Sequence, residues 1–296
     1  MNELHDLNQR YGLPGLSFEA GAGDLTRAVI KTSVASGELY LHGAHITQFQ
    51  PTGHSPVLWM SEHSHFESGK PIRGGVPLCF PWFGPNSKDS TAPAHGLART
   101  ALWDVVATHA INDDGIAIEL SKSLGAFHLN YRVEFGNALQ LSLNVGILED
   151  IAEPQSFEEA LHTYFTVGDI QQVTIKGLES YGYLDKVGAV NKRTATQESI
   201  CFTSETDRVY FDTNSRCVLR DPILKRAITV SQTGSRSTVV WNPWIDKSAR
   251  MPDFGDHEWP KMVCIETANV GDQSVTIQPG QTQTMIARIE VTHQSS

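Results

Sequence analysis

The sequence predicts an all-β fold, organised as one large antiparallel sandwich or barrel. Hydrophobic residues recur with a period of two rather than the period of about 3.6 that marks helices. In residues 139–145, for example, Leu and Val alternate with Gln, Ser and Asn. Turn signals separate such runs at intervals of about eight to twelve residues, as at residues 112–115, 136–137, 271–272 and 279–280. No amphipathic helix longer than about three turns is evident, so few and short helices are expected.

Each expected strand shows either this alternation or a composition rich in β-branched and aromatic residues. In chain order the strands are expected at residues 24–35, 38–49, 103–108, 116–120, 129–135, 139–145, 158–166, 173–178, 228–232, 237–241, 262–268, 275–277 and 285–289. The first of these runs also fits a short helix, and we interpret it as a strand. No low-complexity linker and no internal repeat divides the chain, so a single domain over residues 1–296 is expected.

Composition and charge narrow the class of function. With 296 residues, 40% of them hydrophobic, the chain can bury a large core without disulfides, and global disorder is excluded. The formal net charge of −10 argues against a nucleic-acid partner, which requires a basic face. Residues 1–12 are polar and no run approaches about 18 apolar residues, so neither a secretory signal nor a membrane partner is expected. The cysteines form no C-x-x-C pair and fit mostly buried, reduced thiols of a cytoplasmic protein; they are Cys79, Cys201, Cys217 and Cys264.

Three irregular segments interrupt the alternation, at residues 70–84, 93–99 and 241–257. Long segments without regular structure in a compact β domain are usually functional loops. Arg73 and Arg99 lie in two of them, and a guanidinium offers a planar fork of donors that suits phosphate or carboxylate. Together they could hold an anionic ligand against the exposed backbone of Gly74 and Gly75. The alternative is that each arginine forms a structural ion pair with one of the chain's acids.

Three further residues are candidates for chemistry or binding. His162 lies in a strand-like run, where its imidazole can act as acid or base near neutral pH, or can be a hydrogen-bonded residue at the edge of the core. Glu266 lies between apolar residues in another run, and burial of an unpaired acid is costly. It therefore either pairs with a cation or does chemistry with a raised pKa. Asp207 precedes a short run of strand character, where turn formation explains an aspartate more simply than ligand binding.

Metal and nucleotide sites have less support. His63 and His65, and likewise His42 with His45, invite a metal interpretation, because alternate residues of a strand share a face. Glu67 follows His65 too closely for the acid of a cupin-type site. The sequence also lacks a P-loop, a G-x-G-x-x-G run and a G-x-S-x-G run. We therefore expect neither a metal nor another cofactor.

Taken together, these segments resemble the hexose-6-phosphate mutarotases, the glucose-6-phosphate 1-epimerase branch of the aldose 1-epimerase (galactose mutarotase-like) superfamily. The resemblance runs in order from about residue 25 to about residue 290. It rests on residues 41–45 (LHGAH), 57–61 (VLWMS), 72–77 (IRGGVP), 80–84 (FPWFG), 95–99 (HGLAR), 162–165 (HTYF), 207–210 (DRVY), 241–244 (WNPW) and 262–266 (MVCIE). It implies a large antiparallel β-supersandwich.

The resemblance also implies roles for single residues. His162 stands at the position of the family's catalytic histidine, and Glu266 at that of its catalytic glutamate. Further positions match residues that bind substrate: Arg73 and Arg99 match arginines that hold a sugar phosphate, and Asp207 and His95 match contacts to the sugar. One departure is Ala94, which stands where relatives have a substrate-contacting glutamine; it leaves the sugar preference open.

The implied activity is cofactor-independent interconversion of the α and β anomers of an aldohexose 6-phosphate, with glucose 6-phosphate expected. Glu266 is the implied base and His162 the implied acid, while composition suggests that aromatic residues cover the sugar: Phe80, Trp82 and Trp244. The implied partner is a small sugar phosphate, and a monomer or weak dimer is expected. Alternatives are an aldose 1-epimerase for free sugars, a catalytically idle carbohydrate-binding module and, third, a cupin-like metalloprotein.

Overall fold

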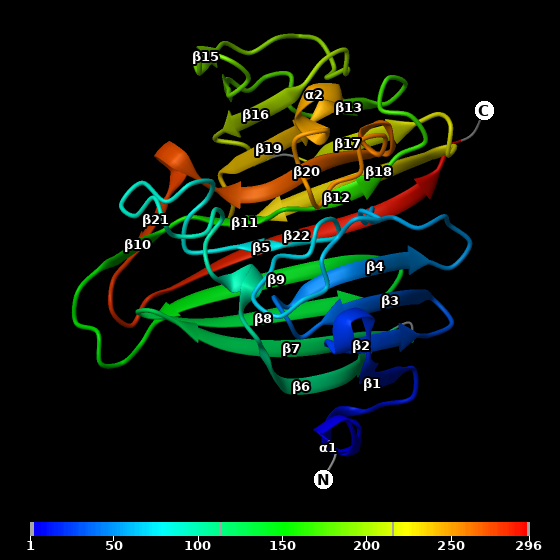
Figure 1. Cartoon of the computed structure of the whole chain (residues 1–296), viewed down its shortest axis with the longest axis vertical. Coiled ribbons are helices and arrows are strands. Elements are labelled where there is room, and N and C mark those ends of the chain that lie inside the picture. Colours follow the sequence, from blue (N-terminus) through cyan, green and yellow to red (C-terminus); the bar gives the residue numbers. More distant parts are fainter. Residues whose placement is uncertain (1–2, 113, 215, 295–296) are drawn as a thin grey trace.

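The computed structural model describes residues 3–112, 114–214 and 216–294. Their regular structure is almost all antiparallel strand, joined by long irregular segments, which confirms the all-β class (Figure 1). Within them, the α-helices are α1 (Glu3–Tyr11) and the single turn α2 (Trp244–Ser248), as the expectation of few short helices required. The sequence did not reveal α1, because residues 1–12 are mostly polar; its apolar side chains pack against the core at Leu4, Leu7 and Tyr11. No helix of the described residues is long and apolar enough to cross a membrane.

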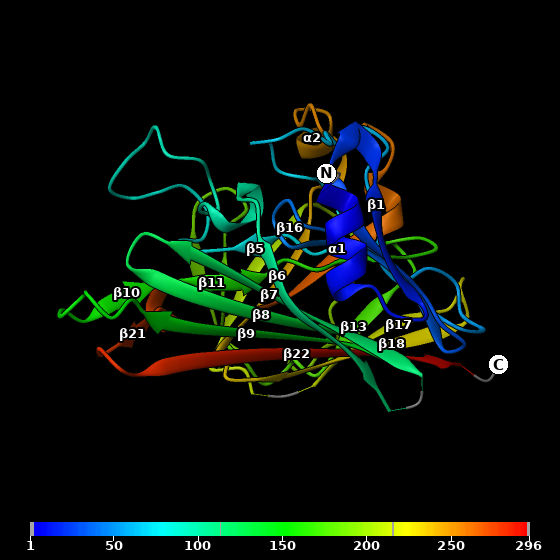
Figure 2. The same cartoon turned by 90° about the horizontal axis from the view of Figure 1, so that it is seen from below.

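One eight-stranded sheet, the core sheet, forms a layer of long antiparallel strands (Figure 2). In spatial order its strands are β13 (Thr174–Lys176), β17 (Cys217–Asp221), β18 (Arg226–Thr233), β22 (Thr282–His293), β9 (Ala138–Ile147), β8 (Phe127–Phe135), β7 (Gly115–Leu124) and β6 (Asp104–Ile111). In β9 the alternation seen in the sequence is confirmed, because its inward-facing Leu139, Leu141, Leu143 and Val145 are fully buried. This burial is the main force that fixes which face of the sheet points inward.

A second eight-stranded sheet, the site sheet, packs against the core sheet. Its strands run in the order β15 (Asn191–Arg193), β14 (Tyr183–Asp185), β16 (Thr206–Phe211), β19 (Ser237–Asn242), β20 (Met262–Asn269), β11 (Glu159–Leu161) and β5 (Leu78–Cys79), with β12 (Tyr164–Thr166) also paired to β20. The run expected as one strand at residues 158–166 is therefore two short strands, interrupted at His162 and Thr163. A third, four-stranded sheet holds β1 (Leu16–Ala20), β2 (Thr26–Lys31), β3 (Ala35–Tyr40) and β4 (His45–Pro51), and β10 (Gln155–Phe157) pairs with β21 (Val275–Ile277).

The four-stranded sheet settles two of the sequence expectations. Residues 24–35 contain the strand β2 and no α-helix, so the strand interpretation is confirmed. Residues 38–49 are not one strand, because the chain turns between β3 and β4 at Gly43 and Ala44, both of which have positive φ. A side chain at Gly43 would place its Cβ 2.5 Å from the carbonyl oxygen of Arg99, so the turn packs too closely for any other residue.

The two faces of the site sheet serve different purposes. Side chains of one face, including Leu161, Val263 and Ile265, join the main hydrophobic cluster between the sheets. The other face carries two smaller clusters, around Trp241 and Cys264 and around Ala160 and Ala268. All eight residues of β20 are buried, so this strand lies under covering segments on its outer face as well. The outer face is therefore an enclosed site rather than a solvated surface.

A buried carboxyl group on this sheet makes folding stability depend on pH. The side chain of Glu159 in β11 has no exposed surface, and its Oε1 accepts a hydrogen bond of 2.8 Å from Nδ2 of Asn269. Oε2 has no partner within the described part of the chain. Burial raises the pKa of Glu159 to about 8. The folded protein therefore holds this proton more tightly than the unfolded chain, in which a glutamate titrates near about 4.3.

We expect Glu159→Gln to remove part of this pH dependence. Because the folded pKa is raised, the contribution of Glu159 to stability is complete below the unfolded pKa and is lost as the pH rises towards 8. The variant should match the wild type near about pH 4.5 and exceed its free energy of unfolding by up to ~5 kcal/mol near about pH 9. Urea unfolding at both pH values measures the difference. An equal difference at both would contradict the buried, proton-binding carboxyl.

Candidate active site

A cavity of about 460 Å³ opens on the outer face of the site sheet. Its floor is formed by residues of the strands and of the break between β11 and β12, and its walls by the irregular segments that the sequence singled out. All six residues to which the resemblance assigns a catalytic or substrate-binding role line it: Arg73, His95, Arg99, His162, Asp207 and Glu266. The other lining residues are Phe83, Gly84, Pro85, Ala94, Tyr164, Lys186, Val239, Trp241, Lys247 and Met251.

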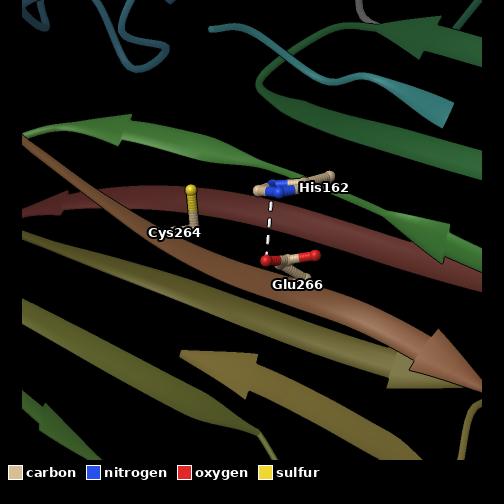
Figure 3. A group of neighbouring side chains, drawn as sticks. All are labelled: His162, Cys264 and Glu266. Atoms are coloured by element: carbon tan, nitrogen blue, oxygen red, sulfur yellow. Dashed lines mark ion pairs between the residues drawn. The ribbon is translucent and has the colours of Figure 1, made fainter. Parts of the chain in front are cut away.

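The strand register brings His162 and Glu266 together. Leu161 lies opposite Thr267 before the interruption of the strand, and Tyr164 lies opposite Cys264 after it. Both pairs belong to the same antiparallel register, so His162 falls opposite Glu266. Figure 3 shows the two side chains facing each other, His162 from the break between β11 and β12 and Glu266 from β20. Nδ1 of His162 lies 3.3 Å from Oε1 of Glu266.

The carboxyl group of Glu266 is almost completely removed from solvent, with 1% of the residue exposed. Oε2 has no hydrogen-bond partner among the residues that the structure describes. Burial, reinforced by the charge of Asp207 and opposed by that of Lys186, raises the pKa of Glu266 well above its usual range. The buried carboxyl therefore favours its protonated form, and Oε2 is left without a partner among the described residues.

The environment of His162 lowers the pKa of its imidazole, whereas that of Glu266 raises the pKa of its carboxyl group. Its ring stacks on that of Tyr164, with the centroids 4.7 Å apart and the planes 9° from parallel. Its Nδ1 makes no hydrogen bond within the described chain, since the contact with Glu266 is not aligned for one. Burial lowers the pKa of His162 well below its usual value, and the nearby His95, Arg73 and Arg99 add to this effect.

These opposite shifts determine where one proton lies in the pair. Both favour the uncharged form, with a protonated carboxyl on Glu266 and a neutral imidazole on His162. The charged form, with carboxylate and imidazolium, has the same number of protons. Because the two groups are 3.3 Å apart, any change of charge around one of them shifts this balance.

His95 lies beside His162, with the ring centroids 5.6 Å apart, in a turn with a φ of 64°. Its Nδ1 accepts a hydrogen bond of 3.3 Å from the backbone N–H of Gly84. Burial and the neighbouring arginines lower the pKa of His95 to about 3, so the ring is neutral. A neutral imidazole that accepts at Nδ1 carries its proton at Nε2, which makes it a donor for a ligand oxygen.

Arg73 is held by two neighbouring side chains. Its Nε and Nη2 donate to the carboxylate of Asp253 at 3.0–3.2 Å, and its Nη1 donates to the hydroxyl of Tyr164 at 2.9 Å. Burial disfavours the charge, but Tyr164 and Asp253 outweigh it and raise the pKa of Arg73. The structural ion pair considered in the sequence analysis is therefore present for this arginine, which nevertheless lines the cavity.

Arg99 has no such compensation. Only 9% of the residue is exposed, Nη2 donates to the carbonyl of Ala94 at 2.7 Å, and Nε has no partner. No ion pair with a described carboxylate holds it. Burial lowers the pKa of Arg99, and the charge of Arg73 lowers it further. A buried and unpaired guanidinium at a cavity wall is a site for an anion.

The expected anion contact with the glycine backbone is wrong. Gly74 and Gly75 are buried and do not line the cavity. The N–H of Gly75 donates to the carbonyl of Trp59 at 2.7 Å, and the carbonyl of Gly74 lies 2.8 Å from Nε2 of His45. These groups hold the segment against the sheet, so they are not available to a ligand in the cavity.

Besides the two arginines, the cavity has a cluster of charged side chains around Asp207. This residue is within β16 rather than in a turn, so the simpler turn explanation is wrong. Its Oδ2 lies 3.6 Å from Nζ of Lys247, which also donates to Glu205 at 2.9 Å. Lys186 lies nearby, with Nζ 5.5 Å from the centre of the Phe83 ring. The cavity is thus lined by Lys186 and Lys247 as well as by the two arginines.

The aromatic residues that cover the site differ from those expected. Phe80 is fully buried and packs between Phe127 and Phe157 in the core. Trp82 donates from Nε1 to the carbonyl of Pro93, and Trp244 packs on Trp259; neither lines the cavity. The rings at the cavity are instead those of Phe83, Tyr164 and Trp241. Composition alone did not distinguish core aromatics from exposed ones within the same loops.

Three potential metal ligands also meet at the site. Ligand atoms of His162, Cys264 and Glu266 all lie within 4.8 Å of one another. A bound metal requires a thiolate and a carboxylate. Burial, and then the charge of Glu266, raise the pKa of Cys264 well above its usual value, so the sulfur is a thiol. This donor set is a poor fit to an ion. Of the histidines that invited a metal interpretation from sequence, His42 and His45 bond to backbone carbonyls.

Several residues of the site were not predicted from the sequence. Lys186, Lys247 and Met251 line the cavity, and Asp253 holds Arg73. Lys247, Met251 and Asp253 lie in the segment 241–257, which the sequence marks as a functional loop without indicating these residues. Tyr164 could have been found, because it shares a face with His162 two residues earlier. No pattern in the sequence pointed to Lys186.

The chain is similar in sequence to proteins of a known enzyme family. The sequence profile of the aldose 1-epimerase family matches residues 29–289. A protein of Escherichia coli K12 named "Putative glucose-6-phosphate 1-epimerase" is 34% identical over 265 residues, which cover 86% of each chain. A protein of Cenchrus ciliaris with the same name is 32% identical, over 82% of this chain and 78% of its own.

The solved structures extend the comparison to the fold. A crystal structure from Salmonella typhimurium, described as that of a putative mutarotase, superposes with a TM-score of 0.89 at 28% identity and covers 96% of both chains. Galactose 1-epimerase from Lactobacillus acidophilus gives a TM-score of 0.70 at 14% identity, a likeness of fold alone. The expected galactose mutarotase-like architecture is confirmed. This chain is an isomerase-type enzyme and belongs to the aldose 1-epimerase family.

Proposed function

We propose that this enzyme interconverts the α and β anomers of an aldohexose 6-phosphate, with glucose 6-phosphate as its substrate. The observation that carries the proposal is the unpaired, buried Arg99, which lines the same cavity as Arg73 and the His162–Glu266 pair. A neutral sugar does not require such a charge, whereas a phosphate dianion compensates it. The names of the relatives from E. coli and Cenchrus ciliaris point to the same substrate.

The chemistry follows from the two facing side chains. Glu266 as carboxylate takes the proton of the C1 hydroxyl, and the C1–O5 bond breaks as the C1 carbonyl forms. His162 as imidazolium gives its proton to O5, so the open-chain aldehyde faces a protonated Glu266 and a neutral His162. Rotation about C1–C2 presents the other face of the carbonyl, and the reverse transfers close the ring. Positioned groups of this kind each contribute about 10²–10⁴-fold.

The pKa directions give this scheme a physical basis. Burial of the pair favours its uncharged form, and that form is the one present when the sugar ring is open. The cavity thus favours the proton positions of the open-chain intermediate. His95 donates from Nε2 to a ring oxygen or hydroxyl, and Asp207 accepts from hydroxyls on the other side.

We expect the enzyme to accelerate exchange between the anomers of glucose 6-phosphate, measured by NMR exchange spectroscopy with and without protein. Free glucose serves as the matched control, because it has the same reacting atoms and lacks the phosphate. Acceleration of the phosphate ester well above that of glucose is the expected result. Acceleration of glucose alone would replace the proposal by a free-sugar epimerase, and acceleration of neither sugar would support an idle binding module.

One observation favours the free-sugar alternative. Asp253 already occupies the Nε and Nη2 donors of Arg73, so part of the positive charge at the cavity is neutralised within the protein. Arg99 is not neutralised in this way, and for this reason we place the phosphorylated substrate first.

A further inference from the structure

We propose that a dianion bound between Arg73 and Arg99 activates the His162–Glu266 pair, with Tyr164 as a positioning residue that carries part of the effect. The inference rests on the proposed function and adds to it. The phosphate of the substrate then acts as an activator of the proton transfer, and not only as a handle for binding.

A continuous chain of contacts joins the anion site to the catalytic pair. Asp253 and the Tyr164 hydroxyl fix the guanidinium of Arg73 from two sides, at 3.0–3.2 Å and 2.9 Å. The Tyr164 ring then lies flat on the imidazole of His162 at 4.7 Å. A ligand that engages the remaining N–H groups of Arg73 therefore restrains the side chain that supports His162. No other described side chain contacts both of these residues in this way.

The charges around the pair make the effect selective. The arginines at the anion site, Arg73 and Arg99, disfavour a proton on His162, as does the neighbouring His95. The groups that act on Glu266 are different ones, Asp207 and Lys186. A dianion between the arginines offsets the charges that oppose the imidazolium of His162. The proton of the pair then shifts from Glu266 towards His162, which is the arrangement that ring opening requires.

This mechanism makes a prediction that simple phosphate binding does not. If the phosphate only anchors the substrate, a separate dianion gives no advantage to free glucose. If the dianion activates the pair, the two parts need not be covalently joined. The cavity of about 460 Å³ is in the range of pockets that enclose small ligands, and the anion and the sugar would share it.

The test is the enzyme-catalysed anomer exchange of free glucose with and without inorganic phosphate or sulfate. We expect acceleration of about tenfold at saturating dianion, the change in protonated fraction that a shift of one pKa unit produces. Inhibition of glucose 6-phosphate turnover by the same anion gives its affinity and the concentration that saturates the site. With sulfate, which stays dianionic over the assay range, the limb of the pH–rate profile that belongs to the acid should move to higher pH.

Tyr164→Phe tests the positioning residue. It keeps the ring stacked on His162 and removes the hydroxyl that accepts from Arg73. The factor by which sulfate accelerates glucose exchange should fall by about threefold or more, while the inhibition constant of sulfate changes less. Tyr131→Phe is the matched control, because Tyr131 is equally buried, its hydroxyl has no partner in the described chain, and it does not line the cavity. Its activation factor should equal that of the wild type.

The outcomes separate this inference from the proposed function. Turnover of glucose 6-phosphate, with sulfate inhibiting it but not accelerating glucose, would overturn the activation and leave the proposed function intact. Failure of sulfate to inhibit would remove the anion site and overturn the inference as well. Absence of turnover with glucose 6-phosphate would refute the proposed function directly. Equal activation in Tyr164→Phe and wild type would reject Tyr164 as the positioning residue.

Discussion

We expect Glu266→Gln to lower the turnover number for glucose 6-phosphate by about 10²–10⁴-fold and to leave the fold and substrate binding nearly unchanged. The amide has the shape of the carboxyl group but cannot accept the proton of the C1 hydroxyl. Because burial raises the pKa of Glu266, the carboxyl is already favoured in its uncharged form, and the neutral amide fits the same surroundings. NMR anomer exchange measures the rate, and binding is followed by calorimetry with glucose 6-phosphate.

The chain offers a closely matched control in Glu159→Gln. Glu159 is also fully buried and lies on β11, the strand paired with β20, but it does not line the cavity. Glu159→Gln makes the same isosteric change, and the activity of this variant should stay within about twofold of the wild type. A wild-type rate for Glu266→Gln would eliminate Glu266 as the base. An equal loss of rate in both variants would mean that the sheet, rather than the carboxyl at the site, had been disturbed.

The sequence predicted the fold where one physical effect dominates. In β9 and β22, alternate side chains are buried against the core, so the period of two is visible in the amino acids themselves. It predicted less where short strands depend on tertiary contacts. The interruption at His162 is stabilised by its backbone N–H, which donates to Pro77, and by Thr163, whose carbonyl accepts from Ile265. No local pattern encodes these distant partners.

The same distinction applies to the site. The individual catalytic and anion-binding candidates were found through family resemblance and residue chemistry, and all of them line one cavity. The support for these residues was not predictable. Asp253 lies 180 positions from Arg73 in the sequence, and the pairing exists only because the segment that holds α2 folds over the site sheet. Phe80 and Phe83 are close in sequence, yet one fills the core and the other lines the cavity.

Arg99→Met should reduce kcat/KM for glucose 6-phosphate by about 10–10²-fold, which corresponds to the loss of charge-assisted hydrogen bonds of ~1.5–3 kcal/mol. Its effect should exceed that of Arg73→Met, because Asp253 already satisfies part of Arg73 while Arg99 bonds only to the carbonyl of Ala94. For free glucose, kcat/KM should stay the same or rise. The substitution removes a cation that disfavours the protonated form of His162 and takes no contact from a neutral sugar.

Stability distinguishes an anion-binding arginine from a structural one. A buried guanidinium without a counter-ion costs free energy in the empty protein, so its replacement by an apolar side chain of similar length should leave the melting temperature unchanged or raise it. Thermal unfolding of the wild type and of Arg99→Met, with and without inorganic phosphate, measures the change in melting temperature. Phosphate should stabilise the wild type and not the variant, by linkage to binding. A large drop in melting temperature, with equal losses for glucose 6-phosphate and glucose, would show that Arg99 supports the fold and that the phosphate is recognised elsewhere.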